Sequence, residues 1–112
     1  MSKDSPVTFA HRVFWGEHKL IQFPVEGGED QVLAWTLEWK LWSDMDRENA
    51  PLITKTSSDG ITVIDNALGM CQVLLTADDW DEVSPGNSYY YELWRVDVNF
   101  EQNLASGEFY VR

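Results

Sequence analysis

The segment 32–42, VLAWTLEWKLW, places a large apolar side chain at every second position. These alternating side chains are Leu33, Trp35, Leu37, Trp39 and Leu41. Successive side chains of an extended chain point to opposite faces, so this period of two predicts one long, half-buried β-strand over Val32–Trp42. Trp35 and Trp39 should lie on its core face, whereas Trp42 falls on the opposite, more polar face.

Similar apolar stretches recur along the chain, and turn-forming residues separate them at intervals of about 8–12 residues. We expect strands over Val7–Trp15, Lys19–Val25, Val32–Trp42, Leu52–Thr56, Ile61–Ile64, Met70–Thr76, Ser88–Val98 and Leu104–Arg112. We also expect one short helical turn at 76–80, after the strand over Met70–Thr76. There Thr76 can accept a hydrogen bond from the N–H of Asp79. This pattern of seven or eight strands predicts an all-β, two-layer antiparallel β-sandwich, with one domain over residues 1–112. The two long strands should lie in the same layer, with the strand over 32–42 in a central position.

The chain is strongly acidic, with 8 Lys and Arg residues against 19 Asp and Glu residues and a formal net charge of −11. Such a charge repels nucleic acids and anionic membranes, so neither is an expected partner. The first residues, MSKDSP, are polar and do not resemble a signal peptide. No apolar run approaches the length of about 20 residues that spans a bilayer. We therefore expect a protein that stays in the cytoplasm of the cell that makes it, or enters a particle assembled there.

The residue types that carry catalysis or bind metals do not form a recognisable pattern. Cys71 is the only cysteine and lies in an apolar run, which favours a buried, inert thiol. His11 and His18 are separated by seven positions and lack a third ligand at a metal-binding spacing. No nucleophile motif and no phosphate-binding loop occurs. The sequence thus predicts no catalytic residue, no metal and no cofactor.

Two acidic clusters allow a chemical and a plainer interpretation. Asp44, Asp46 and Glu48 form D-x-D-x-E, an arrangement of oxygen ligands that could bind calcium. The glycine and the distant glutamate of a calcium loop are missing, so a solvated loop is the plainer interpretation. The cluster over 78–82, DDWDE, holds carboxylates like those of a glycosidase, but helix capping explains half of them.

Aromatic residues are the remaining candidates for a functional surface. They are expected on the polar strand faces or near loops, where they could contact a protein or a sugar. The alternative is that they pack the sandwich or cover its end. The candidate interface residues are Trp42, Trp80, Tyr90, Trp94 and Phe100.

The order of motifs after Trp35 provides one further clue. It runs LEWKLW, PLITKT, SSDGITVID, GMCQVLLTADDWDEVSPG, YYYELWRVD and LASGEFYVR. This order resembles the small immunoglobulin-like β-sandwich domains of tailed bacteriophages and prophages, and is similar to the N-terminal domain of some baseplate upper proteins. The matching residues are Lys55, Gly60, Ile61, Val63, Asp65, Thr76, Asp79, Gly86, Tyr89, Tyr91, Glu92, Leu93, Asp97, Gly107, Phe109 and Val111.

The resemblance implies an immunoglobulin-like fold and a structural role without catalytic residues. Such a protein would be a head, neck, tail or baseplate accessory of a virion, with itself or other virion proteins as partners and a homo-oligomer as one possible state. Edge strands over Leu52–Thr56 or Val7–Trp15 would suit docking. Tyr89 or Tyr91 has the position of a corner tyrosine, although an ordinary core role fits equally well. A carbohydrate-binding module that uses exposed aromatics is the alternative function.

Overall fold

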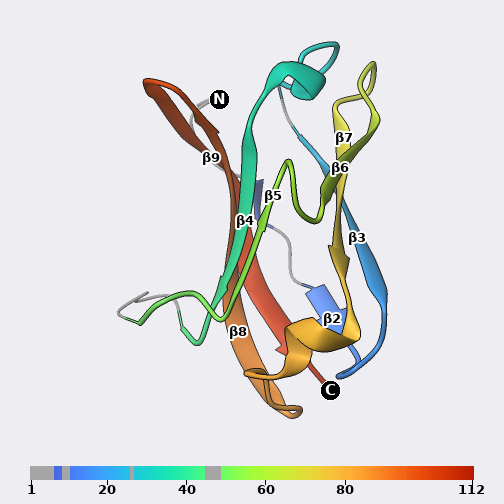
Figure 1. Ribbon diagram of the computed structural model, residues 1–112, viewed down its shortest axis with the longest axis vertical. Coiled ribbons are helices and arrows are strands. Elements are labelled where there is room, and N and C mark those ends of the chain that lie inside the picture. Colours follow the sequence, from blue (N-terminus) through green and yellow to red (C-terminus); the bar gives the residue numbers. More distant parts are fainter. Residues whose placement is uncertain (1–6, 9–10, 26, 45–48) are drawn as a thin grey trace.

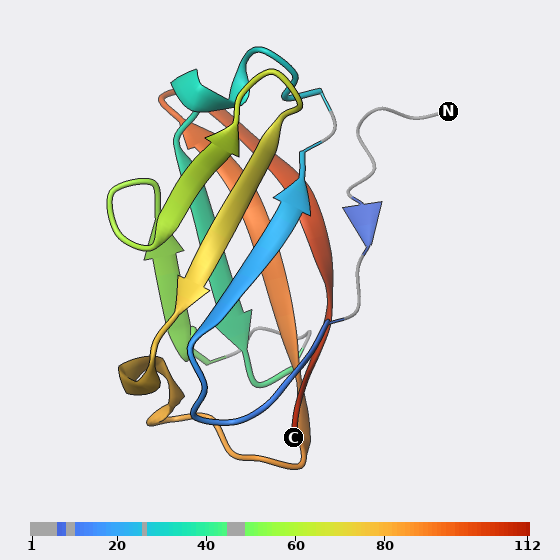
Figure 2. The ribbon, with the colours of Figure 1, turned by 90° about the vertical axis from the view of Figure 1, so that its right-hand side faces the viewer.

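The computed structural model describes residues 7–8, 11–25, 27–44 and 49–112, which form two β-sheets packed face to face (Figures 1 and 2). The larger sheet has the order β1-β9-β8-β4-β5, and β2 also pairs with β9. Its strands are β1 (Val7–Thr8), β2 (His11–Val13), β9 (Phe100–Val111), β8 (Asn87–Asp97), β4 (Leu37–Trp42) and β5 (Ile53–Thr56). The smaller sheet has the order β3-β7-β6, with β3 (Lys19–Pro24), β7 (Met70–Leu75) and β6 (Ile61–Asp65). Two 3₁₀ turns complete these elements, η1 (Val32–Ala34) and η2 (Ala77–Trp80).

This strand order confirms the expected all-β sandwich. Strands β1 and β2 both pair in parallel with β9, so together they act as one edge strand of the larger sheet. The strands β4, β8 and β9 correspond to C, F and G of an immunoglobulin domain, and β3, β7 and β6 to B, E and D. Strand β5 extends the larger sheet beyond β4, as in variable-type domains. The fold is therefore immunoglobulin-like.

Aromatic rings from both sheets form the centre of the core. Trp39, Tyr91 and Phe109 from the larger sheet and Phe23 from the smaller sheet are fully buried. The centroids of the Phe23 and Tyr91 rings lie 5.6 Å apart, and those of Trp39 and Tyr91 lie 6.2 Å apart. In antibody domains a disulfide connects the two sheets between strands B and F. Here the Phe23–Tyr91 ring pair joins the same two strands through apolar contact.

Cys71 is buried in the smaller sheet, as the sequence predicts. Burial raises the pKa of this thiol to about 12, because an apolar environment disfavours the charged thiolate. Cys71 is therefore a core side chain with low nucleophilicity.

The structure corrects the prediction of one strand over 32–42. Only the second half, β4, is a strand, whereas η1 occupies Val32–Ala34. The amide of Val32 bonds to the carbonyl of Gly28, and the Val32 side chain is fully buried. This turn directs Leu33 outward, where it is exposed, and leaves Trp35 only partly buried. Strand β4 lies between β8 and β5, so its central position and its pairing with the other long strand are confirmed.

Tyr89 forms the tyrosine corner, so the structure selects it over Tyr91. Its hydroxyl accepts a hydrogen bond from the Ser84 N–H at 2.7 Å and donates one to the Ser84 carbonyl at 3.3 Å. Tyr91, two residues later, belongs to the core. A tyrosine at the start of strand F with this bonding is typical of immunoglobulin-like sandwiches.

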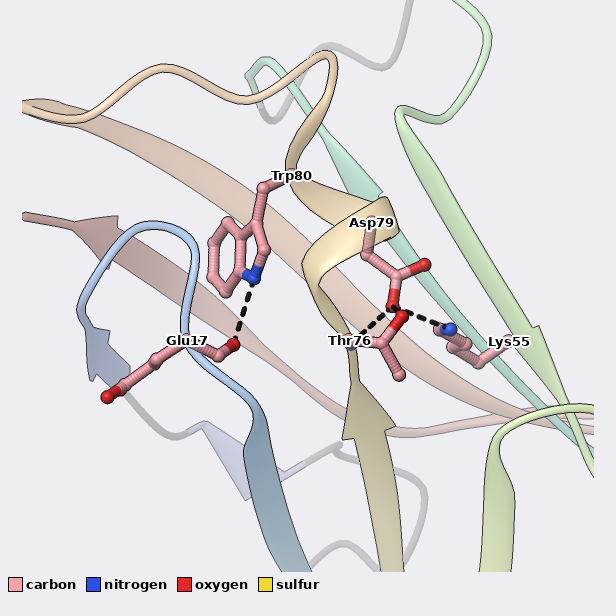
Figure 3. A network of polar contacts seen from close by, with 5 residues as sticks. All are labelled: Glu17, Lys55, Thr76, Asp79 and Trp80. Carbon is pink, nitrogen blue, oxygen red and sulfur yellow. Dashed lines mark hydrogen bonds and ion pairs between the residues drawn. The ribbon is translucent and has the colours of Figure 1, made fainter.

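The expected helical turn forms as η2 and connects three segments (Figure 3). The Asp79 carboxylate accepts a hydrogen bond from the Thr76 N–H at 2.7 Å, and the Asp79 N–H bonds to the Thr76 carbonyl at 3.0 Å. The same carboxylate forms an ion pair with Nζ of Lys55 at 2.8 Å. Trp80 points into the core, and its indole N–H donates to the Glu17 carbonyl at 3.0 Å.

Candidate functional site

The outer face of the larger sheet carries a set of aromatic and charged side chains at its centre. Strands β4 and β8 are antiparallel, and their register places Trp42 opposite Tyr90, Lys40 opposite Glu92, and Glu38 opposite Trp94. Every second residue of each strand points away from the core, so these side chains share one surface. We call this surface, formed by Glu38, Lys40, Trp42, Tyr90, Glu92 and Trp94, the aromatic–carboxylate face.

Glu92 holds two aromatic side chains of this face in place. The Tyr90 hydroxyl donates a hydrogen bond to Oε2 of Glu92 at 2.7 Å, and the Trp94 indole N–H donates to Oε1 at 2.9 Å. Only 3% of Glu92 is exposed. A buried carboxylate is tolerated when its oxygens accept hydrogen bonds, and bonds to a charged group are stronger than neutral ones. Glu92 therefore fixes the orientation of the rings on either side of it.

The remaining contacts make the face rigid. The Trp42 and Tyr90 rings lie 6.2 Å apart at an interplanar angle of 31°, and Trp42 is largely buried. Nζ of Lys40 forms an ion pair with Oε1 of Glu38 at 2.9 Å. Tyr90 and Trp94 are half-buried and remain partly accessible to a partner.

Two depressions flank these rings. The smaller one has a volume of about 190 Å³. It is lined by Trp94 and other residues of the face, together with the neighbouring Val96 and Glu101. The larger one, of about 520 Å³, is lined by Tyr90 and includes three serines and two acidic residues among its lining residues. Its lining residues are Ser43, Asp44, Ser88, Tyr89, Tyr90, Ser106, Gly107 and Glu108. These depressions can receive side chains or hydroxyl groups of a binding partner.

The structure brings together three of the five expected interface residues. Trp42, Tyr90 and Trp94 all belong to the aromatic–carboxylate face. Phe100 lies apart from them at the start of β9, where it is 46% exposed and its ring lies 4.3 Å from the Arg95 guanidinium carbon. Trp80 is corrected from a surface candidate to a core residue, because η2 turns its ring inward and none of it is exposed.

Glu92 is the residue of the candidate site that the sequence analysis did not select as an interface residue. The signal was present, since Tyr90, Glu92 and Trp94 are spaced two residues apart on one strand. In an extended chain this spacing puts a carboxylate between two ring donors on the same face. Lys40 and Glu38 alternate with the core residues of β4, and the β4–β8 register is what places them beside these rings.

The acidic clusters do not form a metal site within the described part of the chain. Among the described residues, no group of three or more His, Cys, Asp or Glu side chains could hold a metal ion. Asp46 and Glu48 of the possible calcium loop lie outside the described residues, as does the side chain of His11. Asp79 of the second cluster is engaged by Lys55 and Thr76 (Figure 3).

Within the same described ranges, no helix has the length and apolar character needed to cross a membrane.

Comparison with known proteins adds no family to this description. No protein-family model matches the chain, and no curated protein is significantly similar to it in sequence. The geometry of the molecule and the order of its sequence motifs therefore carry the functional argument.

Proposed function

We propose that this protein is a non-enzymatic β-sandwich that acts through protein–protein contacts, as an accessory or assembly protein of a tailed-phage or prophage particle. The observation that carries the contact function is the aromatic–carboxylate face, with Tyr90 and Trp94 held by Glu92. The assignment to a phage particle rests on the order of motifs from LEWKLW to LASGEFYVR. A homo-oligomer and a complex with other virion proteins both fit this function.

The composition of the face supports a contact role over a chemical one. Trp and Tyr dominate the energetics of protein interfaces, because they bring large rigid surfaces at low entropic cost. Preordered rings further reduce the cost of binding. Both carboxylate oxygens of Glu92 already accept hydrogen bonds from neighbouring rings, so this group serves to position them.

The edge of the larger sheet at β5 is less suitable for docking than the face. Strand β5 is an edge strand, as expected for the segment 52–56, but its Lys55 side chain points inward and pairs with Asp79. Inward-pointing charges on edge strands are a known protection against pairing with another strand. We therefore assign the contact to the face.

The test is cross-linking of the chain within particles from cells that carry its gene. Lys40 lies on the face, Lys19 lies on the smaller sheet, and Lys55 is in a mostly buried ion pair. An amine-reactive cross-linker should link Lys40, but not Lys19, to a neighbouring protein.

Trp94→Ala should reduce incorporation into particles by at least about tenfold, as for an interface hot spot.

The matched control is Leu20→Ala, which truncates an exposed side chain of the smaller sheet. It should leave incorporation unchanged. Absence of the chain from purified particles would contradict the phage assignment. Equal incorporation of the Trp94→Ala protein would contradict the assignment of the contact to the face.

A carbohydrate-binding module is the second candidate function. It is favoured by the larger depression, of about 520 Å³, beside Tyr90. Its serine hydroxyls and the carboxylates of Asp44 and Glu108 can bond to sugar hydroxyls. The aromatic rings fit this function less well, because Trp42 is largely buried and inclined by 31° to Tyr90. Titration with soluble oligosaccharides, followed by tryptophan fluorescence, distinguishes the two. Saturable binding that Tyr90→Ala abolishes would favour the sugar function.

A further inference from the structure

One end of the sandwich carries four exposed apolar side chains, in η1, in the β6–β7 turn and where β8 connects to β9. Leu33 lies in η1 and is 69% exposed, and Leu68 of the β6–β7 turn is 65% exposed. At the β8–β9 turn, Val98 is 90% exposed and Phe100 is 46% exposed. These turns lie at the same end of the molecule, uppermost in Figures 1 and 2. We call Leu33, Leu68, Val98 and Phe100 the apolar end.

Hydrogen bonds join the first two of these turns. The Asn66 side-chain oxygen accepts the Leu33 N–H at 2.8 Å, and the Asn66 carbonyl accepts the Asp30 N–H at 2.7 Å. The Leu68 N–H also donates a hydrogen bond to Oδ1 of Asp65 at 3.1 Å, within the β6–β7 turn. These bonds hold the turns that carry Leu33 and Leu68 against each other.

A second set of contacts joins this surface to the β8–β9 turn. The Thr36 N–H donates to Oδ1 of Asp97 at 2.6 Å, and the Val96 N–H donates to the Thr36 carbonyl at 2.8 Å. The Arg95 guanidinium carbon lies 4.2 Å from the Trp35 ring and 4.3 Å from the Phe100 ring. The apolar side chains thus project from a preordered base, which lowers the entropic cost of binding.

The charges around the apolar end are acidic. Arg95 forms an ion pair with Asp97 at 2.6 Å, so its charge is compensated. The Thr36 N–H and Arg95 lower the pKa of Asp97, which keeps this carboxylate ionised in the pair. Glu29 and Asp30 are exposed in the segment that precedes η1, and Glu101 is exposed next to Phe100 in β9. A second copy of the chain would bring a like-charged rim against this one, which disfavours self-association here.

We propose that the apolar end is a docking site for a protein partner whose apolar patch is edged by Lys or Arg side chains. Exposed apolar patches with a polar rim mark protein interaction sites, and charge complementarity selects a basic partner. The inference rests on the proposed protein-binding function but uses different residues from the aromatic–carboxylate face. Two separate contact surfaces would let the chain connect two neighbours.

The probe for this site is a synthetic amphipathic peptide made of Leu and Lys, with a Leu and Glu peptide of the same pattern as its control. Titration into the ¹⁵N-labelled chain should shift amide signals of residues 29–36, 65–69 and 97–101. The double variant Leu68→Ser/Val98→Ser should weaken binding of the Leu and Lys peptide by at least about tenfold, because two apolar contacts are lost. The Leu and Glu peptide should not bind.

Phe14→Ser is the matched control, since Phe14 is 59% exposed and lies outside these turns. It should bind the Leu and Lys peptide like the original chain.

The inference is overturned if the shifts spread over the acidic surface or centre on Trp94, or if the double variant binds equally well. It is also overturned if sedimentation shows a dimer that the double variant abolishes. Trp94→Ala should not affect peptide binding, so failure of the proposed function and failure of this inference are distinguishable.

Discussion

At the scale of single residues, one hydroxyl group secures the crossover that leads into β8. Tyr89 is mostly buried, and its hydroxyl satisfies both the N–H and the carbonyl of Ser84. Each of these hydrogen bonds ties the exposed Ser84 main chain to the buried Tyr89 ring. The corner therefore stabilises the loop that connects the smaller sheet to the larger one.

Tyr89→Phe should lower the free energy of unfolding by about 1 kcal/mol, because it removes the hydroxyl that bonds to the exposed Ser84 main chain. The ring and its packing remain, so the loss reports the hydroxyl alone. Equilibrium unfolding in urea measures it. Tyr110→Phe is the control, because the Tyr110 side chain is half-exposed on the outer face, and its effect should stay within about 0.5 kcal/mol. Equal effects of the two variants would contradict the role of the corner.

At the scale of elements, Lys55 connects the edge strand β5 to η2. Its side chain lies close to Gly60, the residue before β6. Its Nζ reaches the carboxylate of Asp79 (Figure 3). Gly60 has a φ of +103°, and a Cβ built there would lie 2.5 Å from Cδ of Lys55. A glycine is needed at this position both for its backbone conformation and for the space that the lysine stem occupies.

Gly60→Ala should destabilise the protein more than Gly16→Ala does. Gly16 also has a positive φ, of +83°, but a Cβ there would have no heavy atom within 4 Å. Both variants incur backbone strain of about 1–3 kcal/mol. Gly60→Ala should lose about 1 kcal/mol more, because it displaces Lys55 from its ion pair. Thermal and urea unfolding compare the two. If their losses are the same, the lysine stem does not depend on Gly60.

At the scale of the whole molecule, the buried thiol reports on the cooperativity of the sandwich. Cys71 pairs with Phe23 on one side and Val63 on the other, at the middle of the smaller sheet. Its thiol is fully buried and its pKa is raised to about 12. A reagent that needs the thiolate can therefore reach it only when the sheets separate.

Labelling of Cys71 by iodoacetamide at pH 8 should be at least about 1,000-fold slower in the native protein than in urea, as expected for a stably folded domain. Unfolding restores both access and the ordinary pKa of the thiol, which is why the rate rises. Mass spectrometry follows the reaction. Thr62→Cys in a Cys71→Ala background provides the control, since position 62 is exposed and should label rapidly in the native state. Fast native labelling of Cys71 would show that the smaller sheet opens locally.

The local pattern was sufficient to predict most of the fold. Strands β3, β5, β6, β7 and β8 lie within about two residues of their expected bounds, because period-two alternation and turn residues act locally. The prediction failed at the C-terminal hairpin, where β9 begins at Phe100 and continues through Ser106 and Gly107. Pairing with the long strand β8 holds this segment extended despite its turn-forming residues.

The sequence by itself determined the class of the fold and the character of the candidate face. Alternation over Leu37–Trp42 predicts a sheet with one apolar side, and Tyr90, Glu92 and Trp94 share a face because they lie on one strand. Tertiary structure alone decided where the alternation stops. Val32 enters the core and the Leu33 N–H bonds to Asn66, 33 positions away, so η1 replaces a strand. The burial of Trp80 and the apolar end likewise depend on contacts between distant segments, which no local pattern specifies.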